Sequence, residues 1–319
     1  MATVPLGYYL WKRIHQIGVN TVMGLPGDFQ LHLLDQIYKV EGLRFVGNSN
    51  ELNAAYAVDG YARTKNVPGC LVTTHGVGEL SALNGIAGSL TEQVKVIHVV
   101  GQTTRPMQRN HAMIHHSIGF RPDHQIFSKA SRDFRGAAAE LQDVRSAPYE
   151  IDRVIRACFI QSCPVYIFIP LDMVDEPVPA GLLDTPIDIS VPDDALTKQT
   201  MEAAATAILK AISESRKPAV FVDALMHRHN AVAEIRDLTK KLGFPVYASQ
   251  ISKGVIHETD PNYVDVYSGS IASPGVADAF ESSDLLLVFG HLPADTNGGL
   301  TQKIPANKTI DFKTDQVDV

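Results

Sequence analysis

Two carboxylates and a histidine pair are the side chains of this sequence best suited to acid–base chemistry. Asp28 follows a short apolar run directly, Glu51 opens an alanine-rich segment, and His115 and His116 are adjacent in a stretch without regular apolar spacing. An unperturbed imidazole titrates near neutrality, and a carboxyl group in suitable surroundings can act as an acid or a base. These residue types indicate proton transfer.

Each carboxylate also has a structural interpretation. Asp28 immediately precedes a predicted helix over 29–40, where it would serve as the N-cap. Glu51 starts the next predicted helix, where a carboxylate interacts favourably with the helix dipole. On these residues taken singly, capping is the simpler interpretation, and the catalytic interpretation stays open.

The histidines allow a metal-site hypothesis as well. His111 and His115 are four residues apart, so a helix would place them on one face, and His124 is nearby. Zinc needs a further ligand, and Ala112 stands where a zinc-protease motif has glutamate. A solvated polar loop and a proton-transfer site are the alternatives. We predict no metal ligand in this chain.

Gly76-Val77-Gly78 lies between an apolar strand and a helix and forms half of a dinucleotide-binding fingerprint. Ser81 replaces the third glycine, and no acidic residue ends the next strand. The alternative is that the glycines let the chain turn sharply. The sequence contains no Gly-x-x-x-x-Gly-Lys-Ser/Thr, which excludes a P-loop enzyme.

The elements that must position these residues alternate between short apolar runs and amphipathic segments. We expect strands over 21–24, 43–46, 70–74, 94–100, 164–170, 218–223, 245–248, 283–290 and 308–312. We expect helices over 6–17, 31–40, 51–63, 81–90, 150–157, 200–213 and 230–242. Apolar strands that alternate with helices indicate parallel sheets covered on both faces. The predicted fold class is α/β, with two doubly wound parallel-sheet domains.

A stretch rich in proline and aspartate separates the two predicted domains. The 319 residues suit about two domains at ~150 residues each. We expect a first domain over 1–184, a linker over 185–197 and a second domain over 198–319. No closing helix follows the apolar strand at 308–312, so we expect the second domain to be incomplete.

Composition is that of a folded protein and excludes several classes. A hydrophobic fraction of 45% is ordinary, and 28 Lys+Arg against 35 Asp+Glu gives a net charge of −7, which argues against nucleic-acid binding. The three cysteines form no CxxC pair, which suits a reducing compartment. Neither a run of ~18 apolar residues nor a secretory signal is evident, so we expect a cytoplasmic protein without a membrane partner.

Four stretches, in order, resemble the thiamine-diphosphate-dependent 2-oxo acid decarboxylases, and most closely the fungal pyruvate decarboxylase branch. They are Gly24–Phe29, Asn50–Arg63, Gly76–Ala82 and the His115-His116 pair. The resemblance extends from about residue 6 to about residue 314. It implies that the first domain binds the aminopyrimidine half of the cofactor and that the second is the family's Rossmann-like central domain.

The resemblance also implies a reaction and a role for each candidate residue. The reaction is non-oxidative decarboxylation of a small 2-oxo acid, pyruvate by default, to an aldehyde and carbon dioxide, with thiamine diphosphate and Mg²⁺ as cofactors. Glu51 would bind a nitrogen of the aminopyrimidine, which requires surroundings that favour its protonated form. Asp28, His115 and His116 would carry protons to the product. The remaining cofactor contacts implied by the family are Thr74, Gly76, Val77 and Gly78.

The sequence departs from the family pattern in several places. It contains no Gly-Asp-Gly, with which the family's third domain binds magnesium and diphosphate, so we expect those ligands outside this chain. His75 replaces a usual aromatic residue and adds a titratable group beside the cofactor turn. Residues 119–124 replace a short glycine-rich loop.

The resemblance also implies partners, because the family's sites form between subunits. We expect a homo-oligomer, or a hetero-oligomer with a full-length relative. The alternative hypothesis is a catalytically incomplete remnant, or a regulatory partner of a full-length decarboxylase.

Overall fold

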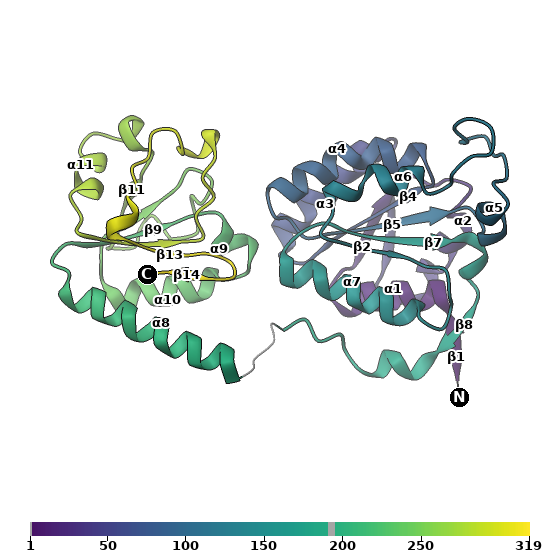
Figure 1. Cartoon of the computed structure of the whole chain (residues 1–319), viewed down its shortest axis with the longest axis horizontal. Helices are drawn as coiled ribbons and strands as arrows, with labels where there is room; N and C mark the ends of the chain where they lie inside the picture. Colours follow the sequence, from purple (N-terminus) through teal and green to yellow (C-terminus); the bar gives the residue numbers. More distant parts are fainter. Residues whose placement is uncertain (1, 191–194) are drawn as a thin grey trace. The chain divides into compact units, whose positions relative to one another are not determined.

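The computed structural model describes residues 2–190 and 195–319, and the chain divides into two compact units, Met1–Val191 and Pro192–Val319 (Figure 1). Each unit is built on a sheet of six strands. The predicted α/β class with parallel sheets is confirmed.

The first sheet consists of parallel strands in the spatial order β3-β2-β4-β5-β7-β6. The strands are β2 (Thr21–Gly24), β3 (Arg44–Gly47), β4 (Gly69–Thr74), β5 (Val96–Gln102), β6 (Ala137–Glu140) and β7 (Val165–Pro170). Strands β4, β5 and β7 are buried along their whole length, which explains why their sequences are mostly apolar rather than alternating. A separate antiparallel pair joins β1 (Thr3–Pro5) to β8 (Pro177–Pro179).

Helices cover both faces of the first sheet. One face packs against α1 (Leu6–Gln16), α2 (Leu31–Asp35) and α7 (Ala147–Gln161), and the other against α3 (Glu51–Lys65) and α4 (Val77–Thr91). Two shorter helices, α5 (Arg105–Arg109) and α6 (Ile126–Ala130), lie in the connection between β5 and β6. The buried Trp11 indole donates a hydrogen bond to the carbonyl of Leu33 at 2.7 Å, which ties α1 to α2. The first unit is therefore doubly wound.

The second sheet has the order β11-β10-β9-β12-β13-β14, parallel except for the last pair. Its strands are β9 (Pro218–Val222), β10 (Val246–Ala248), β11 (Tyr263–Val266), β12 (Leu285–Phe289), β13 (Thr309–Phe312) and β14 (Val317–Asp318). Helices α8 (Ala195–Glu214) and α10 (Val232–Leu242) pack on one face and α11 (Val276–Glu281) on the other, while the short α9 (Leu225–Arg228) follows β9. None of the described helices has the length and apolarity that a bilayer crossing requires.

The predicted elements differ from the observed ones in two instructive places. The helix expected over 31–40 is only α2 followed by a 3-10 turn over Ile37–Lys39. Strand β6 was not predicted because its sequence, Ala-Ala-Ala-Glu, favours a helix. Pairing with β7 overrides that preference.

The predicted linker contacts the first unit over part of its length. Arg13 donates to the carbonyl of Thr185 at 2.7 Å, and Arg156 donates to the carbonyl of Ser190 at 2.8 Å. Residues 191–194 of the predicted linker lie outside the described residues, and α8 already begins at Ala195. The domain limits 1–184 and 198–319 stay predictions.

Candidate active site

The candidate residues meet because β2, β3, β4 and β5 are parallel, so their carboxyl ends share one edge of the sheet. Asp28 lies in the loop after β2, and Glu51 begins the helix after β3. Gly76 lies in the turn after β4, and His115 and His116 lie in the long connection after β5.

Asp28 and His115 form an accessible pair at this edge. The His115 Nε2 atom lies 3.5 Å from the Asp28 Oδ2 atom, and the two side chains are 62% and 53% exposed. The His115 ring also stacks on Phe29, with the centroids 5.9 Å apart. An exposed ion pair contributes little to stability, so the pair is available for exchange of protons with a bound molecule.

His116 is held by a main-chain acceptor. Its Nδ1 atom donates to the carbonyl oxygen of His75 at 2.8 Å, and its ring lies 4.2 Å from that of His115 between centroids. Since a carbonyl can only accept, the proton of neutral His116 is placed on Nδ1 and the lone pair on Nε2. The Nε2 atom can then take up or return a proton.

The capping interpretation is wrong for Asp28, whereas Glu51 does lie in the first turn of α3, where its carboxylate suits the helix dipole. The side chain of Asn50, not of Glu51, caps α3 by accepting from the backbone N–H of Asn53 at 3.1 Å. Helix α2 begins at Leu31 with Gln30 as its N-cap residue, so Asp28 caps no helix there. Glu51 is half-buried, and its Oε1 atom lies 3.0 Å from the place that a Cβ on Gly78 would occupy.

The turn between β4 and α4 depends on its glycines. Gly76 has a φ of 77°, and a Cβ there would lie 3.1 Å from the Phe127 ring. A Cβ on Gly78 would lie 3.0 Å from the Thr74 methyl group as well as from Glu51. Val77 is exposed, whereas the Thr74 hydroxyl is buried and has no hydrogen-bond partner among the described residues. The turn therefore brings the main chain of Gly78 close to the Glu51 carboxyl group.

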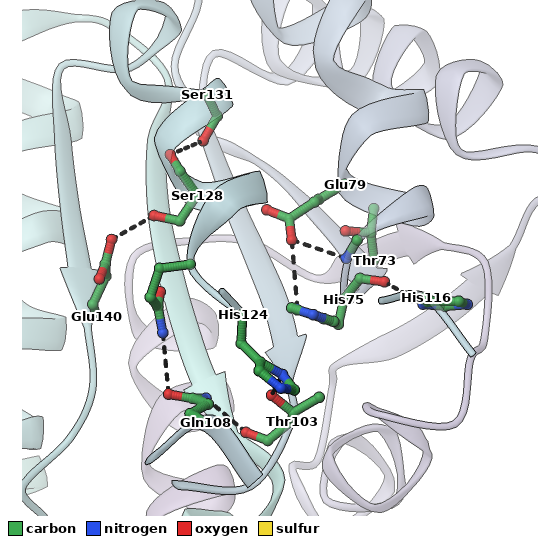
Figure 2. Close-up of polar contacts among 12 residues, drawn as sticks. Thr73, His75, Glu79, Thr103, Gln108, His116, His124, Ser128, Ser131 and Glu140 are labelled. Atoms are coloured by element: carbon green, nitrogen blue, oxygen red, sulfur yellow. Dashed lines mark hydrogen bonds and ion pairs between the residues drawn. The ribbon is translucent and has the colours of Figure 1, made fainter. Parts of the chain in front are cut away.

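Two buried titratable side chains lie behind this turn (Figure 2). Glu79 Oε1 accepts a hydrogen bond from the Gly76 N–H at 3.0 Å and lies 3.9 Å from His75 Nδ1. Burial raises the pKa of Glu79 to about 8. Burial, together with the neighbouring His124 and His116, lowers the pKa of His75 to about 4. Both side chains are therefore predominantly neutral near pH 7.

The hypothesis of a histidine face on a helix is wrong. Helix α5 ends at Arg109, and His111 has a φ of 50° with its Nδ1 atom donating to the carbonyl of Pro122 at 3.0 Å. His124 instead accepts from Thr103 and donates to Ala112, both at 2.9 Å. Across 2–190 and 195–319 no three His, Cys, Asp or Glu side chains are grouped so as to hold a metal ion.

Two family descriptions match this chain in the order in which its units occur. The thiamine pyrophosphate enzyme N-terminal TPP binding domain matches residues 5–123, and the thiamine pyrophosphate enzyme central domain matches residues 205–319. The chain belongs to the thiamine pyrophosphate enzymes. The resemblance seen in the four sequence motifs is thereby confirmed.

Curated relatives of this thiamine pyrophosphate enzyme are fungal pyruvate decarboxylases. The chain is 43% identical over 321 residues to pyruvate decarboxylase isozyme 1 of Saccharomyces cerevisiae and to pyruvate decarboxylase of Kluyveromyces lactis. It is 41% identical over 321 residues to pyruvate decarboxylase of Candida albicans. Each alignment covers 100% of this chain but 56% of the relative, so the chain spans little more than half of their length.

For two residues of the candidate site, the sequence predicted no role. Phe29 contacts the rings of His75, His115 and His116. Glu79 accepts a hydrogen bond from the N–H of Gly76, the N-cap residue of α4. A glutamate three positions after a helix-initiating residue is the second half of a capping box, and this spacing from Gly76 was the available signal.

Proposed function

We propose that this chain supplies the aminopyrimidine side of the active site of a thiamine-diphosphate-dependent 2-oxo acid decarboxylase, with pyruvate as the default substrate. The observation that carries the proposal is the meeting of Glu51, Gly78 and the Asp28–His115 pair at one sheet edge. Similarity to fungal pyruvate decarboxylases supports the substrate class. The reaction converts a 2-oxo acid anion and one proton into an aldehyde and carbon dioxide.

The residues around the glycine turn fit the aminopyrimidine half of the cofactor. Glu51 offers a carboxyl group that can hydrogen-bond a ring nitrogen, and the missing Cβ of Gly78 lets the main chain approach it closely. Thr74 has an unpartnered buried hydroxyl, and Gly76 and Val77 contribute backbone. When bound, thiamine diphosphate supplies a thiazolium ring that takes up the electron pair left by the departing carbon dioxide. We place the magnesium and diphosphate ligands outside the described residues.

The histidines and Asp28 are suited to the proton that the reaction consumes. The Nε2 atom of His115 lies 3.5 Å from the Asp28 carboxylate, so the two side chains can act together as an acid–base pair. His116 keeps Nε2 as its exchangeable position because Nδ1 is committed to the His75 carbonyl. Proton transfer by such positioned groups contributes about 10²- to 10⁴-fold to a rate.

We propose that the site works in an oligomer, formed by copies of this chain or with a longer relative. The predicted cytoplasmic location is kept as part of this proposal. A chain that holds one side of the site can donate Asp28, Glu51 and the histidine pair to a partner that holds the other.

Aldehyde formation tests the proposal. The purified chain is supplied with pyruvate, thiamine diphosphate and Mg²⁺, alone and mixed with Saccharomyces cerevisiae isozyme 1 that carries glutamine at the position aligned with Glu51. We expect activity in at least one arm, lowered by about 10²-fold or more by Glu51→Gln in this chain. Activity only in the mixture identifies donation to a partner. No activity in either arm would refute the proposal.

A further inference from the structure

Glu79 and His75 are buried side chains for which the proposed proton transfers have no use. They are 3% and 2% exposed. The Glu79 Oε2 and His75 Nδ1 atoms are buried without a hydrogen-bond partner among the described residues. Buried polar atoms are nearly always paired, so an unpaired carboxyl oxygen and an unpaired ring nitrogen on neighbouring side chains call for an explanation.

Two hydrogen bonds connect this pair to the edge of the site (Figure 2). Glu79 accepts from the N–H of Gly76 at 3.0 Å, and the carbonyl of His75 accepts from His116 Nδ1 at 2.8 Å. That carbonyl and that N–H belong to the same peptide group, which joins His75 to Gly76. Glu79 therefore acts on the plane of the peptide that orients the His116 ring.

We propose that Glu79 is a positioning residue: by accepting the Gly76 N–H it holds the His75–Gly76 peptide and, through it, His116, so that a change of charge on Glu79 is transmitted to the His116 ring. The positioning stands on the two hydrogen bonds alone. Its effect on turnover rests on the proposed function.

The groups that face Glu79 explain why its neutral form prevails. Arg135 attracts the carboxylate and Glu140 repels it, while the desolvation of a buried charge outweighs both and raises the pKa of Glu79 to about 8. The Arg135 guanidinium already lies 3.9 Å from Glu140 and 5.3 Å from the centre of the Tyr166 ring. Tyr166 is itself neutral, because burial raises its pKa well above the ordinary value.

The groups that face His75 keep that side chain neutral as well. His124 and His116 oppose a further positive charge, and the His75 ring packs against Phe29 and Phe127 at centroid distances of 5.7 and 5.1 Å. His98, deeper in the sheet, is paired with the Thr73 hydroxyl at 2.9 Å, and burial lowers its pKa to about 3. Near pH 8 the group of this cluster that gains charge is Glu79.

Two matched variants separate positioning from general charge effects. Glu79→Gln keeps an oxygen for the Gly76 N–H and imitates the protonated acid, but it cannot ionise. Glu140→Gln removes a carboxylate that contacts Ser128 and Arg135 and makes no hydrogen bond or ion pair with the turn among the described residues. A third variant, His75→Phe, keeps the ring packing and removes the nitrogen that faces Glu79.

Nitrogen-15 NMR of the histidine rings between pH 6 and 9.5 tests the proposal, with His116 assigned through a His116→Gln variant. We expect the His116 Nδ1 shift of the wild-type chain to show a step with a midpoint near pH 8, the pKa of Glu79. The step persists in Glu140→Gln and His75→Phe and disappears in Glu79→Gln.

A wild-type titration without that step, or a step that survives in Glu79→Gln, would overturn the proposal. The wild-type curve decides even where Glu79→Gln fails to fold. Because the titration needs neither cofactor nor turnover, an inactive chain leaves this result intact. Failure of the decarboxylase proposal and failure of the positioning proposal are thereby distinguished.

Discussion

Asp28 follows β2 of the first sheet, and Asp223 follows β9 of the second, each just beyond the carboxyl end of a parallel strand. The Asp28 side chain is 53% exposed and faces His115. Asp223 is fully buried, and its carboxylate accepts from the N–H groups of Ala224 and Leu292 at 2.6 and 2.9 Å. It also accepts from the Asn297 amide at 2.9 Å.

The difference shows that one architecture serves two purposes. The Asp223 carboxylate also accepts a hydrogen bond from the Ser249 hydroxyl. Its hydrogen bonds therefore connect the loops that follow β9, β10 and β12, and these loops pack together at the carboxyl ends of the second sheet. The first edge keeps Asp28 and His115 accessible and brings the Gly78 main chain close to Glu51. The parallel sheet provides the place for a site, and the side chains in the loops decide whether a ligand can use it.

The largest expected effect is the loss of Asp223. Asp223→Ala leaves the Asn297 amide and two backbone N–H groups buried without their acceptor, and we expect it to lower the free energy of unfolding by about 3–5 kcal/mol. Chemical denaturation followed by circular dichroism measures the change.

Asp28→Ala is the matched control at the first edge. Because its ion pair is exposed, we expect a change in the free energy of unfolding within about 0.5 kcal/mol. Equal losses for the two variants would contradict the comparison.

The next effect is a pH dependence of stability from Glu79. Its pKa is about 8 in the folded chain against an ordinary 4.5, so the folded state binds the additional proton and stability falls as pH rises between these values. The depressed pKa of His75, about 4, works in the opposite direction, but its contribution is complete above pH 6.5. From pH 6.5 to 8 the wild-type chain therefore loses up to about 2 kcal/mol through Glu79.

Glu79→Gln removes this loss. We expect its free energy of unfolding, measured in denaturant at several pH values, to rise relative to the wild-type value between pH 6.5 and 8. Parallel pH profiles for the two proteins would mean that Glu79 is not the group responsible.

The smallest effect concerns two glycines of α4. A Cβ on Gly88 meets nothing within 4 Å, so Gly88→Ala stabilises the helix by about 0.5–1 kcal/mol. A Cβ on Gly78 lies 3.0 Å from Glu51 Oε1 and from Thr74, so Gly78→Ala is less stable than Gly88→Ala by about 1 kcal/mol. Thermal unfolding measures both.

Gly78→Ala also fills the space proposed for the cofactor. Calorimetric titration with thiamine diphosphate and Mg²⁺ is expected to show weaker binding for Gly78→Ala and unchanged binding for Gly88→Ala. The same affinity for both variants would remove Gly78 from the proposed site.

Sequence patterns predicted the parts of the fold that depend on burial along one strand. The segments that form β4, β5 and β7 are mostly apolar, and parallel pairing then brings the loops after them to one edge. Strand β6 was not predicted because its alanines do not favour a strand. Its pairing with β7 determines its conformation. The hydrophobic pattern therefore predicts a strand correctly where the segment's own residues are buried, and fails where only pairing with a neighbouring strand decides the conformation.

The site was predictable in its residue types but not in its contacts. The approach of His115 to Asp28 depends on an irregular connection after β5 in which His111 adopts a positive φ, and no periodic pattern describes such a path. The neutral state of Glu79 depends on burial close to Arg135, Glu140 and Tyr166, which are distant from it in sequence. Local spacing shows neither feature.

Hydrogen–deuterium exchange with and without millimolar thiamine diphosphate and Mg²⁺ tests most directly whether the first edge is the ligand site. We predict slower exchange in the peptides that contain Glu51 and Gly76–Gly78, and unchanged exchange around Asp223 and Asn297. Protection around Asp223, or no protection at the first edge, would contradict the account.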